Sequence, residues 1–375
     1  MADSPDFPQG MSCPTPANDT ERVQLGHGSG GKQTAMLVRD RFFAWLSNEI
    51  LAKQTDAAVL NLGSTKIAVS TDTFVVKPLE FPGGDIGSLS VHGTLNDLAM
   101  MGAEPLYMTA GFVLEEGLEL EVLDRVVASL ARAAAEAGVE GRKGRADDTG
   151  DTGGAVEGGV PIVCGDTKVV ERGKCDGMYI NTTGIGQIDP AFTPSPEKAR
   201  PGDAVIVSGP IGRHGIAVMA QREGLEFDVE VESDAATLWP LVERLRDAIG
   251  DAVHVLRDPT RGGVASALNE IAQSAEVGIE LNENSLPIPQ PVLAACELLG
   301  FDPLYVANEG ILIAIVEEHV ASDAVKVLQS HPLGAAAAII GRVVSTNSGI
   351  VALKTAVGGT RVVDMLSGDQ LPRIC

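Results

Sequence analysis

Several features are absent or scarce in this sequence, and each absence excludes a class of protein. No apolar run of about 18 residues occurs among the 375, so we expect no membrane span. Only 28 residues are basic against 51 acidic ones, and the formal net charge of −23 argues against binding to nucleic-acid phosphates as the main activity. The five cysteines are scattered without a CxxC spacing, which argues against a zinc site or disulfide framework and favours the cytoplasm.

Two common site motifs are also missing. His27, His92 and His214 lack the HExxH spacing of a zinc enzyme. The glycine-rich segment 26–32, GHGSGGK, is followed by Gln33, so it fails the Walker A pattern. It still offers a row of backbone N–H groups before a helix expected from Gln33 to about residue 52. A phosphate cradle and a flexible turn both remain open for it.

The length predicts more than one core, and two domains of mixed strands and helices, α/β or α+β, are the expected class. Residues 1–22 are polar and lack the features of a signal peptide, so we expect a disordered leader. We assign 23–189 to a first domain, which carries a low-complexity insertion at 141–159 that we expect to be flexible. Residues 190–357 form a second domain, and 358–375 a mobile tail.

Three aspartates stand among apolar neighbours where that residue is unfavourable. Asp72 and Asp166 follow predicted strands, and Asp97 lies inside a helix predicted over 88–101 with Ser88 as its N-cap. Carboxylates are the ligands that Mg²⁺ uses when it bridges nucleotide phosphates. The alternative is that each aspartate caps or turns the chain locally.

Two later segments combine charge with tight backbone. Residues 257–264, RDPTRGGV, lead into a helix and provide an anion-receptive start with Arg261, Gly262 and Gly263. Residues 305–310, YVANEG, place Glu309 before a strand. Each could equally be an ordinary loop. Cys164 and Cys175, in or beside strands, are interpreted as core residues.

The last residue, Cys375, follows a segment spaced by glycines and a proline. Extended from Gly358, this segment could reach roughly 60 Å, so the thiol could visit a site elsewhere on the molecule. Arg373 should slightly favour the thiolate. We interpret Cys375 as a reactive group on a movable arm; the alternative is a frayed terminus.

Six strings together resemble the HypE family of hydrogenase-maturation proteins, within the aminoimidazole-ribonucleotide-synthetase-like (PurM-like) superfamily. They occur in the family's order from Val23 onward, and the terminal PRIC separates this family from selenophosphate synthetase and thiamine-monophosphate kinase. They are residues 26–32, 70–100, 165–173, 257–272, 304–310 and 372–375. The leader and the insertion depart from the family pattern but interrupt none of these strings.

The resemblance implies an ATP-dependent carbamoyl dehydratase that converts a thiocarbamate on Cys375 into a thiocyanate. A HypF-like carbamoyltransferase would load Cys375, and the cyano group would pass to iron on a HypC–HypD-like complex for a NiFe hydrogenase. Glu309 is the candidate base, and Lys168 the residue that polarises the oxygen. Mg²⁺ would be held by Asp72, Asp97 and Asp166. ATP would be bound by Gly28, Ser29, Gly30, Gly31, Lys32, Asn96, Asp97, Thr167, Arg261, Gly262 and Gly263.

The resemblance also implies the architecture. Each half would be a PurM-like α/β domain, and the first sheet would pair across a two-fold axis to form a barrel and a homodimer. ATP would lie at the junction of domains and subunits. Two rival functions stay open: a small-molecule kinase or synthase that does not use Cys375, and a non-catalytic scaffold, against which the intact Asp72, Asp97, Asp166 and Lys168 argue.

Overall fold

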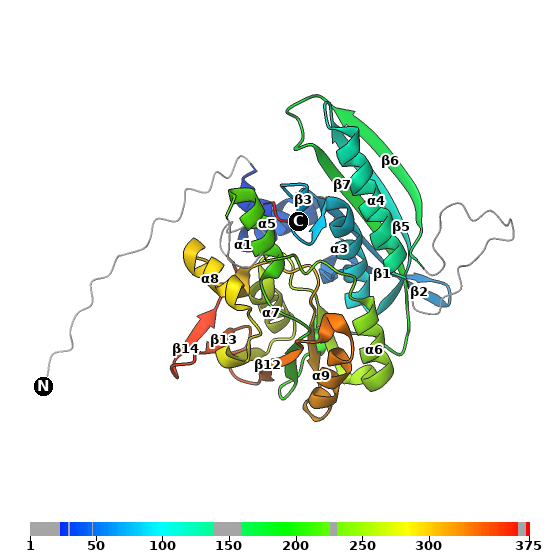
Figure 1. Cartoon of the computed structure of the whole chain (residues 1–375). Helices are drawn as coiled ribbons and strands as arrows, with labels where there is room; N and C mark the ends of the chain where they lie inside the picture. The colour runs from blue at the N-terminus through cyan, green and yellow to red at the C-terminus, as the bar shows by residue number, and fades with distance from the viewer. Residues whose placement is uncertain (1–22, 29–30, 47, 139–158, 226–230, 367–372) are drawn as a thin grey trace, which may run out of the picture.

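The computed structural model describes residues 23–28, 31–46, 48–138, 159–225, 231–366 and 373–375. The predicted leader and nearly all of the predicted insertion fall outside these residues. Two sheets with their own helices form the molecule, one above the other in Figure 1, and the C-terminus lies between them. No helix within the described ranges has both the length and the apolar character needed to cross a bilayer.

The first sheet has five strands in the order β1-β2-β7-β5-β6. All neighbours are antiparallel except β5 and β6, which run parallel. The strands are β1 Ala58–Leu62, β2 Thr65–Phe74, β5 Ala103–Glu115, β6 Ile162–Val170 and β7 Met178–Ile188, and a small ribbon of β3 Glu80–Phe81 and β4 Gly84–Asp85 lies beside them. Asp72 and Asp166 were expected after strands, but β2 and β6 extend past them.

Helices cover one face of this sheet, and the other face is open. Helix α3, Ile86–Met100, packs on the strands, and α4, Leu120–Glu136, lies against it on the same side (Figure 1). Along β7 the burial alternates: Met178 and Ile180 are buried beneath the helices, whereas Asn181 is exposed on the open face. This alternation is the period of two that a one-sided sheet requires.

The second sheet has seven strands in the order β14-β13-β10-β12-β8-β11-β9, with helices on both faces. Its interior strand β8, Ala204–Val207, is fully buried, and Val205 and Ile206 belong to different core clusters. The other strands are β9 Val253–Arg257, β10 Gly278–Asn282, β11 Ile313–Val316, β12 Ala338–Val344, β13 Val351–Lys354 and β14 Thr360–Val363. The helices are α5 Arg213–Glu223, α6 Trp239–Ile249, α7 Gly263–Ser274, α8 Gln290–Leu299 and α9 Ala321–Gln329.

Two expectations about helices need correction. Helix α3 starts two residues before Ser88, because Asp85 is the N-cap: its carboxylate accepts from Gly87 and Ser88 N–H, and Ser88 Oγ accepts from Asp85 N–H. The long helix expected after Lys32 is broken into α1 Lys32–Leu37, a π-helical turn Val38–Phe42, α2 Phe43–Leu46 and a short turn Leu51–Lys53. None of the described side chains in these pieces is buried, so no core packing stabilises one continuous helix.

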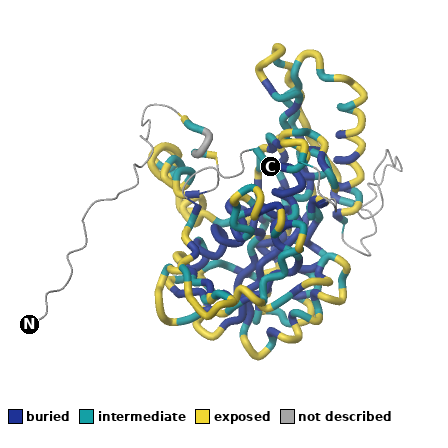
Figure 2. The backbone as a smooth tube through the Cα atoms, turned by 60° about the vertical axis from the view of Figure 1, so that its left-hand side comes forward, coloured by how far each residue is buried: buried dark blue, intermediate teal, exposed yellow. Residues whose placement is uncertain are grey.

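The predicted tail is part of the fold at both of its described ends. Strand β14 pairs antiparallel with β13 and buries Val363, so residues 360–363 belong to the second sheet and not to an arm. At the other end Ile374 is buried in the core of the first domain, and Cys375 packs against that core. Figure 2 places the C-terminus at the upper edge of the buried centre of the molecule.

Candidate functional site

A group of carboxylates lies where β2, α3 and the end of β9 meet. Oxygen atoms of Asp56, Asp97 and Asp258 all lie within 4.8 Å of one another. Asp56 precedes β1, Asp97 lies on α3, and Asp258 directly follows β9. Asp72, on β2, interacts electrostatically with all three. Three distant stretches of chain therefore converge on one acidic site.

The cluster carries more negative charge than its surroundings neutralise. Burial and then repulsion from Asp72, Asp258 and Asp56 raise the pKa of Asp97 well above its usual range. Burial, with Asp56 as the next cause, raises the pKa of Asp258 to about 7. The pKa values of Asp56 and Asp72 are raised as well, chiefly by burial. A divalent cation is the natural complement of such a group.

Two neighbours hold the carboxylates in place. Ser70, on β2, donates its hydroxyl to Asp97 Oδ2 at 2.5 Å. Arg257 forms ion pairs with Asp56 and with Glu270 of α7, each at 2.5 Å. Asp97 and Asp258 have no such cation partner among the described residues, so Arg257 leaves most of the charge available for a metal.

Arg261, Glu309 and Cys375 lie next to the cluster. Asp72 and Arg261 act on one another electrostatically, and so do Arg261 and Cys375. Burial raises the pKa of the Cys375 thiol to about 12; Arg261 opposes the rise, whereas Glu309 and Asp72 add to it. The expected help from Arg373 is therefore wrong for the docked tail, because its guanidinium turns away to Asp176.

Glu309 is the most unusual side chain of the site. It is 3% exposed, and its Oε1 has no hydrogen-bond partner within the described part of the chain. Burial and then repulsion from Asp258 and Asp234 raise its pKa well above the usual value. Its backbone is fixed by Asp234, whose carboxylate accepts from the N–H groups of Glu309 and Gly310 at 3.3 and 3.1 Å. A buried, unpaired carboxylate beside a thiol is suited to moving protons.

The glycine segments of the predicted nucleotide site flank these residues. Gly262 and Gly263 both have positive φ values, 78° and 61°, at the start of α7. A Cβ on Gly263 would lie 2.5 Å from the carbonyl oxygen of Leu304, so the tight turn requires glycine there. Arg261 Nη1 donates to the carbonyl of Gly28 at 3.2 Å, which joins this turn to the first glycine segment.

The first glycine segment is in contact with the base of the tail. Lys32 N–H donates to the carbonyl of Leu366 at 2.9 Å, and Lys32 Nζ pairs with Asp364 at 2.6 Å. A Cβ on Gly31 would lie 2.2 Å from the same Leu366 oxygen. Ser29 and Gly30 lie outside the described residues. Lys32, predicted to bind phosphate, is thus held by an exposed ion pair that a phosphate could replace.

Asn96 has a structural task in this molecule. Its side-chain amide donates to the carbonyls of Ala236 and Glu309 and accepts from Leu238 N–H, and the residue is 1% exposed. These bonds join α3 to the second domain. The neighbouring position, Asp97, is the one that faces the acidic cluster.

Asp166, Thr167 and Lys168 do not join the cluster within one chain. Across the sheet Asp72 aligns with Thr182, Ala110 and Gly165, so Asp166 lies about three strand spacings, roughly 14 Å, away. Asp166 is also the neighbour of Gly165, so its side chain points to the opposite, open face. Lys168 Nζ pairs with Asp166 at 2.5 Å, and both side chains are about 70% exposed. The trio of Asp72, Asp97 and Asp166 is therefore not assembled by a single chain.

Sequence reasoning missed two residues of the cluster and misjudged a cysteine. Asp56 lies in the segment TDAAVL that leads into β1, and Asp258 lies inside the quoted string RDPTRGG, so both signals were present. Their proximity depends on contacts between segments some 200 residues apart, which periodicity does not reveal. Cys164, expected in a core, is exposed on the edge strand β6, whereas Cys175 is buried as expected.

Known proteins match this chain over nearly its whole length. The family model of the AIR synthase related protein N-terminal domain matches residues 54–188, and that of the C-terminal domain matches 200–354. The carbamoyl dehydratase HypE of Cupriavidus necator is 49% identical over 94% of this chain and 95% of its own length. The Escherichia coli protein of that name is 42% identical over 94% and 99%.

Solved structures agree with these matches. A structure of the HypE–HypF complex superposes with a TM-score of 0.79 at 44% identity, covering 88% of this chain and 99% of the other. HypE in complex with ATP gives a TM-score of 0.74 at 47% identity, covering 94% and 100%. The thiamine monophosphate kinase of Aquifex aeolicus, at 18% identity, shares the fold, with a TM-score of 0.59. With relatives at 42 to 49% identity over nearly the whole chain and both domain models matched, the chain belongs to the HypE family of AIR synthase related proteins.

Proposed function

We propose that this protein is an ATP-dependent dehydratase that converts S-carbamoyl-Cys375 into S-cyano-Cys375 during maturation of a NiFe hydrogenase. The observation that carries the proposal is the position of Cys375, docked beside Arg261 and Glu309 next to the acidic cluster. A small-molecule kinase would need the acidic cluster but not a thiol held beside it. The names of the relatives support the same activity.

The residues of the cluster fit a magnesium nucleotide. Asp56, Asp97 and Asp258 would hold Mg²⁺, with Asp72 beside them, because their mutual repulsion leaves charge that Arg257 alone does not offset. Mg²⁺ supplies neutralisation of phosphate charge when it is bound. Arg261 and the glycine segments would face the phosphates. The solved ATP complex of a relative supports nucleotide binding by this fold.

The reaction removes one oxygen and two protons from the carbamoyl group. The amide oxygen attacks the γ-phosphorus of ATP and releases ADP, and the nitrogen loses its first proton, which leaves an imidate phosphate on the sulfur. The nitrogen then loses its second proton while the C–O bond breaks, so phosphate leaves and a carbon–nitrogen triple bond forms. Phosphorylation is needed because an unmodified amide oxygen is a poor leaving group. The sum is thiocarbamate plus ATP to thiocyanate, ADP and phosphate.

Glu309 is the proton acceptor in this proposal. Its raised pKa makes the ionised carboxylate a strong base in a buried setting, and its unpartnered Oε1 is available for a new hydrogen bond. A bound cation would offset the negative charge of the cluster and weaken its repulsion of Glu309. A larger fraction of Glu309 would then be ionised. Lys168 cannot polarise the oxygen from within the same chain, since it lies on the open face of the first sheet.

A homodimer would give Asp166, Thr167 and Lys168 a role. Every residue of β6 but the last is exposed, including Val163 and Val169 at 57% and 68%. An edge strand with exposed apolar residues is unstable in isolation and is suited to pairing with a second copy. Closure of the open face into a barrel across a two-fold axis would cover β6 and place these three residues at the subunit junction.

The partners follow from the chemistry. A HypF-like carbamoyltransferase would load the thiol, as the solved HypE–HypF complex of a relative suggests, and a HypC–HypD-like iron complex would accept the cyano group. The cytoplasm would be the compartment, because loading uses a free thiol and transfer of the cyano group regenerates it.

Mass spectrometry of the C-terminal peptide tests the proposal. After incubation with ATP and the carbamoylating partner, the peptide of the wild-type protein should gain about 43 Da and then lose about 18 Da, the mass of water. Cys375→Ala should still bind ATP but show neither shift, and Cys375→Ser should not restore them. Cys164→Ala and Cys175→Ala should keep both shifts. A modification that maps to either of those cysteines, or cyanide transfer by Cys375→Ala, would favour the small-molecule enzyme.

A further inference from the structure

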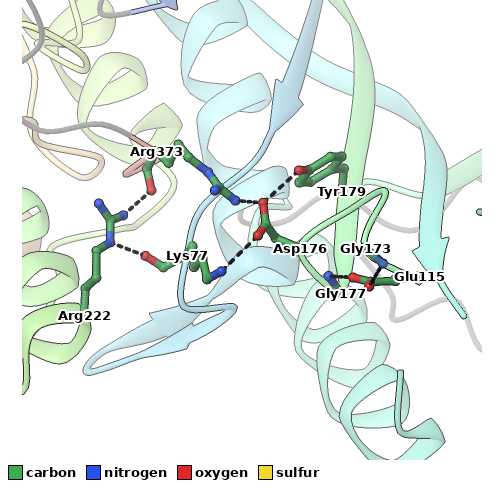
Figure 3. Close-up of polar contacts among 8 residues, drawn as sticks. All are labelled: Lys77, Glu115, Gly173, Asp176, Gly177, Tyr179, Arg222 and Arg373. Atoms are coloured by element: carbon green, nitrogen blue, oxygen red, sulfur yellow. Dashed lines mark hydrogen bonds and ion pairs between the residues drawn. The ribbon is translucent and has the colours of Figure 1, made fainter. Parts of the chain in front are cut away.

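Residues of both domains contact the main chain of the docked tail. Val75 N–H donates to a main-chain oxygen of Cys375, and Lys77 N–H to the carbonyl of Arg373, each at 3.2 Å. Arg222 of α5 donates Nε to the carbonyl of Lys77 at 2.7 Å and Nη2 to that of Arg373 at 2.5 Å. Figure 3 shows Arg222 bridging these two carbonyls from one side.

The side chain of Asp176 joins the tail to the first domain. Asp176 accepts from the guanidinium of Arg373, from Lys77 Nζ at 2.9 Å and from Tyr179 OH at 2.9 Å. Figure 3 shows Arg373 and Lys77 reaching the same carboxylate from different directions. These donors, Lys77 first, lower the pKa of Asp176 to about 2, so it is ionised at neutral pH. It is 23% exposed, which shields the pair partly from water.

The backbone of Arg373 indicates that this contact is needed. Arg373 has φ +58°, the left-handed region that side chains other than glycine rarely adopt. Such a conformation is strained and persists where the surroundings impose it. The ion pair with Asp176 and the two carbonyl contacts are what hold it there, and the next two residues place Ile374 in the core and Cys375 at the site.

From this geometry we propose that Asp176 is a positioning residue, which holds the tail through Arg373 so that the Cys375 sulfur lies beside Arg261 and Glu309. The proposal rests on the dehydratase function for its catalytic consequence, but the docking itself can be measured without it. Asp176 also keeps Lys77 and Arg373 together. Without its charge, two cations would face one another and drive the tail out.

Alkylation of Cys375 by iodoacetamide tests the docking in the full chain without nucleotide or metal. Docking leaves Cys375 half-buried and raises the pKa of its thiol, so release of the tail should speed labelling. Asp176→Asn should speed labelling of Cys375 about tenfold, as loss of a partly buried ion pair implies. The exposed Cys164 is the internal reference and should react at an unchanged rate. Unchanged labelling of Cys375 would overturn the proposal.

Two further variants separate the contact from general damage to the loop. Glu115→Gln is the matched control, because Glu115 accepts from Gly173 and Gly177 in the same loop but does not touch the tail (Figure 3). It should leave labelling of Cys375 unchanged; equal acceleration would overturn the proposal. Adding Arg373→Gln to Asp176→Asn should slow labelling relative to Asp176→Asn alone, because it removes the repulsion from Lys77. Additive acceleration would count against Arg373 as the link.

The catalytic consequence has its own readout. With carbamoyl-loaded protein and saturating ATP, Asp176→Asn should lower the rate of water loss while leaving the affinity for ATP unchanged. Accelerated labelling without a slower reaction would show that docking is not needed for turnover and would overturn the positioning role. If Cys375 never carries a carbamoyl group even in the wild type, the dehydratase function fails, while the labelling results still decide the role of Asp176 in docking.

Discussion

The imidazole of His214 donates its Nε2–H to the carbonyl of Ile374 at 2.7 Å, and its Nδ1 accepts from the hydroxyl of Ser233 at 2.9 Å. The carbonyl can only accept, so Nε2 carries a proton. His214 is completely buried, and burial lowers its pKa to about 4. A neutral histidine on α5 thus holds the residue before Cys375.

This histidine should make stability depend on pH. Its pKa is about 4 in the folded state against an ordinary 6.5, so the unfolded chain binds the proton first as the pH falls. The stability it contributes is complete above pH 6.5 and is lost as the pH falls towards 4, by about 2 to 3 kcal/mol at pH 4.5. His214→Gln can still donate to Ile374 but does not titrate. Urea unfolding at pH 7.5 and 4.5 should show wild type losing its advantage over this variant; a constant difference would contradict the assignment.

Asp97→Asn should weaken Mg²⁺-dependent ATP hydrolysis at least about tenfold while leaving the fold intact, because it removes a charge from the cluster but keeps the shape. The apparent affinity for Mg²⁺, measured by titration of activity, should fall with it. Asp124→Asn, an exposed aspartate on α4, is the matched control. Normal hydrolysis by Asp97→Asn would mean that the metal site must be redrawn around Asp56, Asp72 and Asp258.

Ile374→Ala should release the tail more strongly than the substitution of any exposed residue of the tail. The side chain is 3% exposed in the core of the first domain, and its truncation should cost about 2 to 4 kcal/mol of docking free energy. Proteolysis or hydrogen exchange of the C-terminal peptide should report the release, while the melting of the two domains changes little. Equal protection in the variant would show that the apolar contact does not hold the tail.

Val169→Glu tests the homodimer. Val169 lies on the edge strand β6 with 68% exposure, and a buried charge at a subunit interface costs several kcal/mol. Sedimentation should show a shift towards monomer, with Val127→Glu on the exposed face of α4 as the control. A variant that remains dimeric would place the interface elsewhere.

Deletion of residues 141–159 should leave ATP turnover and dimerisation nearly unchanged. The segment has no apolar periodicity with which to pack, and nearly all of it lies outside the described residues. A shortened chain that loses either property would show that the insertion is an ordered element. Turnover and sedimentation of the deleted protein measure both.

Local patterns predicted the two-domain class, one long helix of the first domain and the family. The helix expected over 88–101 differs from α3 only at its ends, because the reciprocal bonds of Asp85 and Ser88 set the start. The predicted family is confirmed by relatives at 42 to 49% identity. These successes depend on periodicity and on strings of residues close in sequence.

The site could be predicted only in part, since its remaining features are long-range. Asp97 was selected because a helix interior disfavours aspartate, but nothing local pairs it with Asp56 or Asp258. Asp166 has the same local signal as Asp72, and only the register across four strands shows that the two face opposite sides. Asp176, beside a cysteine in an ordinary loop, has no sequence signal at all.

The contacts that hold the tail bind its main chain and the side chains of Arg373 and Ile374, which has a consequence for the chemical states of Cys375 that can dock. Val75, Lys77, Arg222 and His214 all engage main-chain atoms of residues 373–375, and Asp176 and the core engage the side chains of Arg373 and Ile374. None of these hydrogen bonds and ion pairs involves the sulfur of Cys375. These contacts would therefore hold the tail in the same way whether the thiol of Cys375 is free, carbamoylated or cyanated. Under the proposed function, the charged groups that act on the thiol, Arg261, Glu309 and Asp72, would have to distinguish these forms.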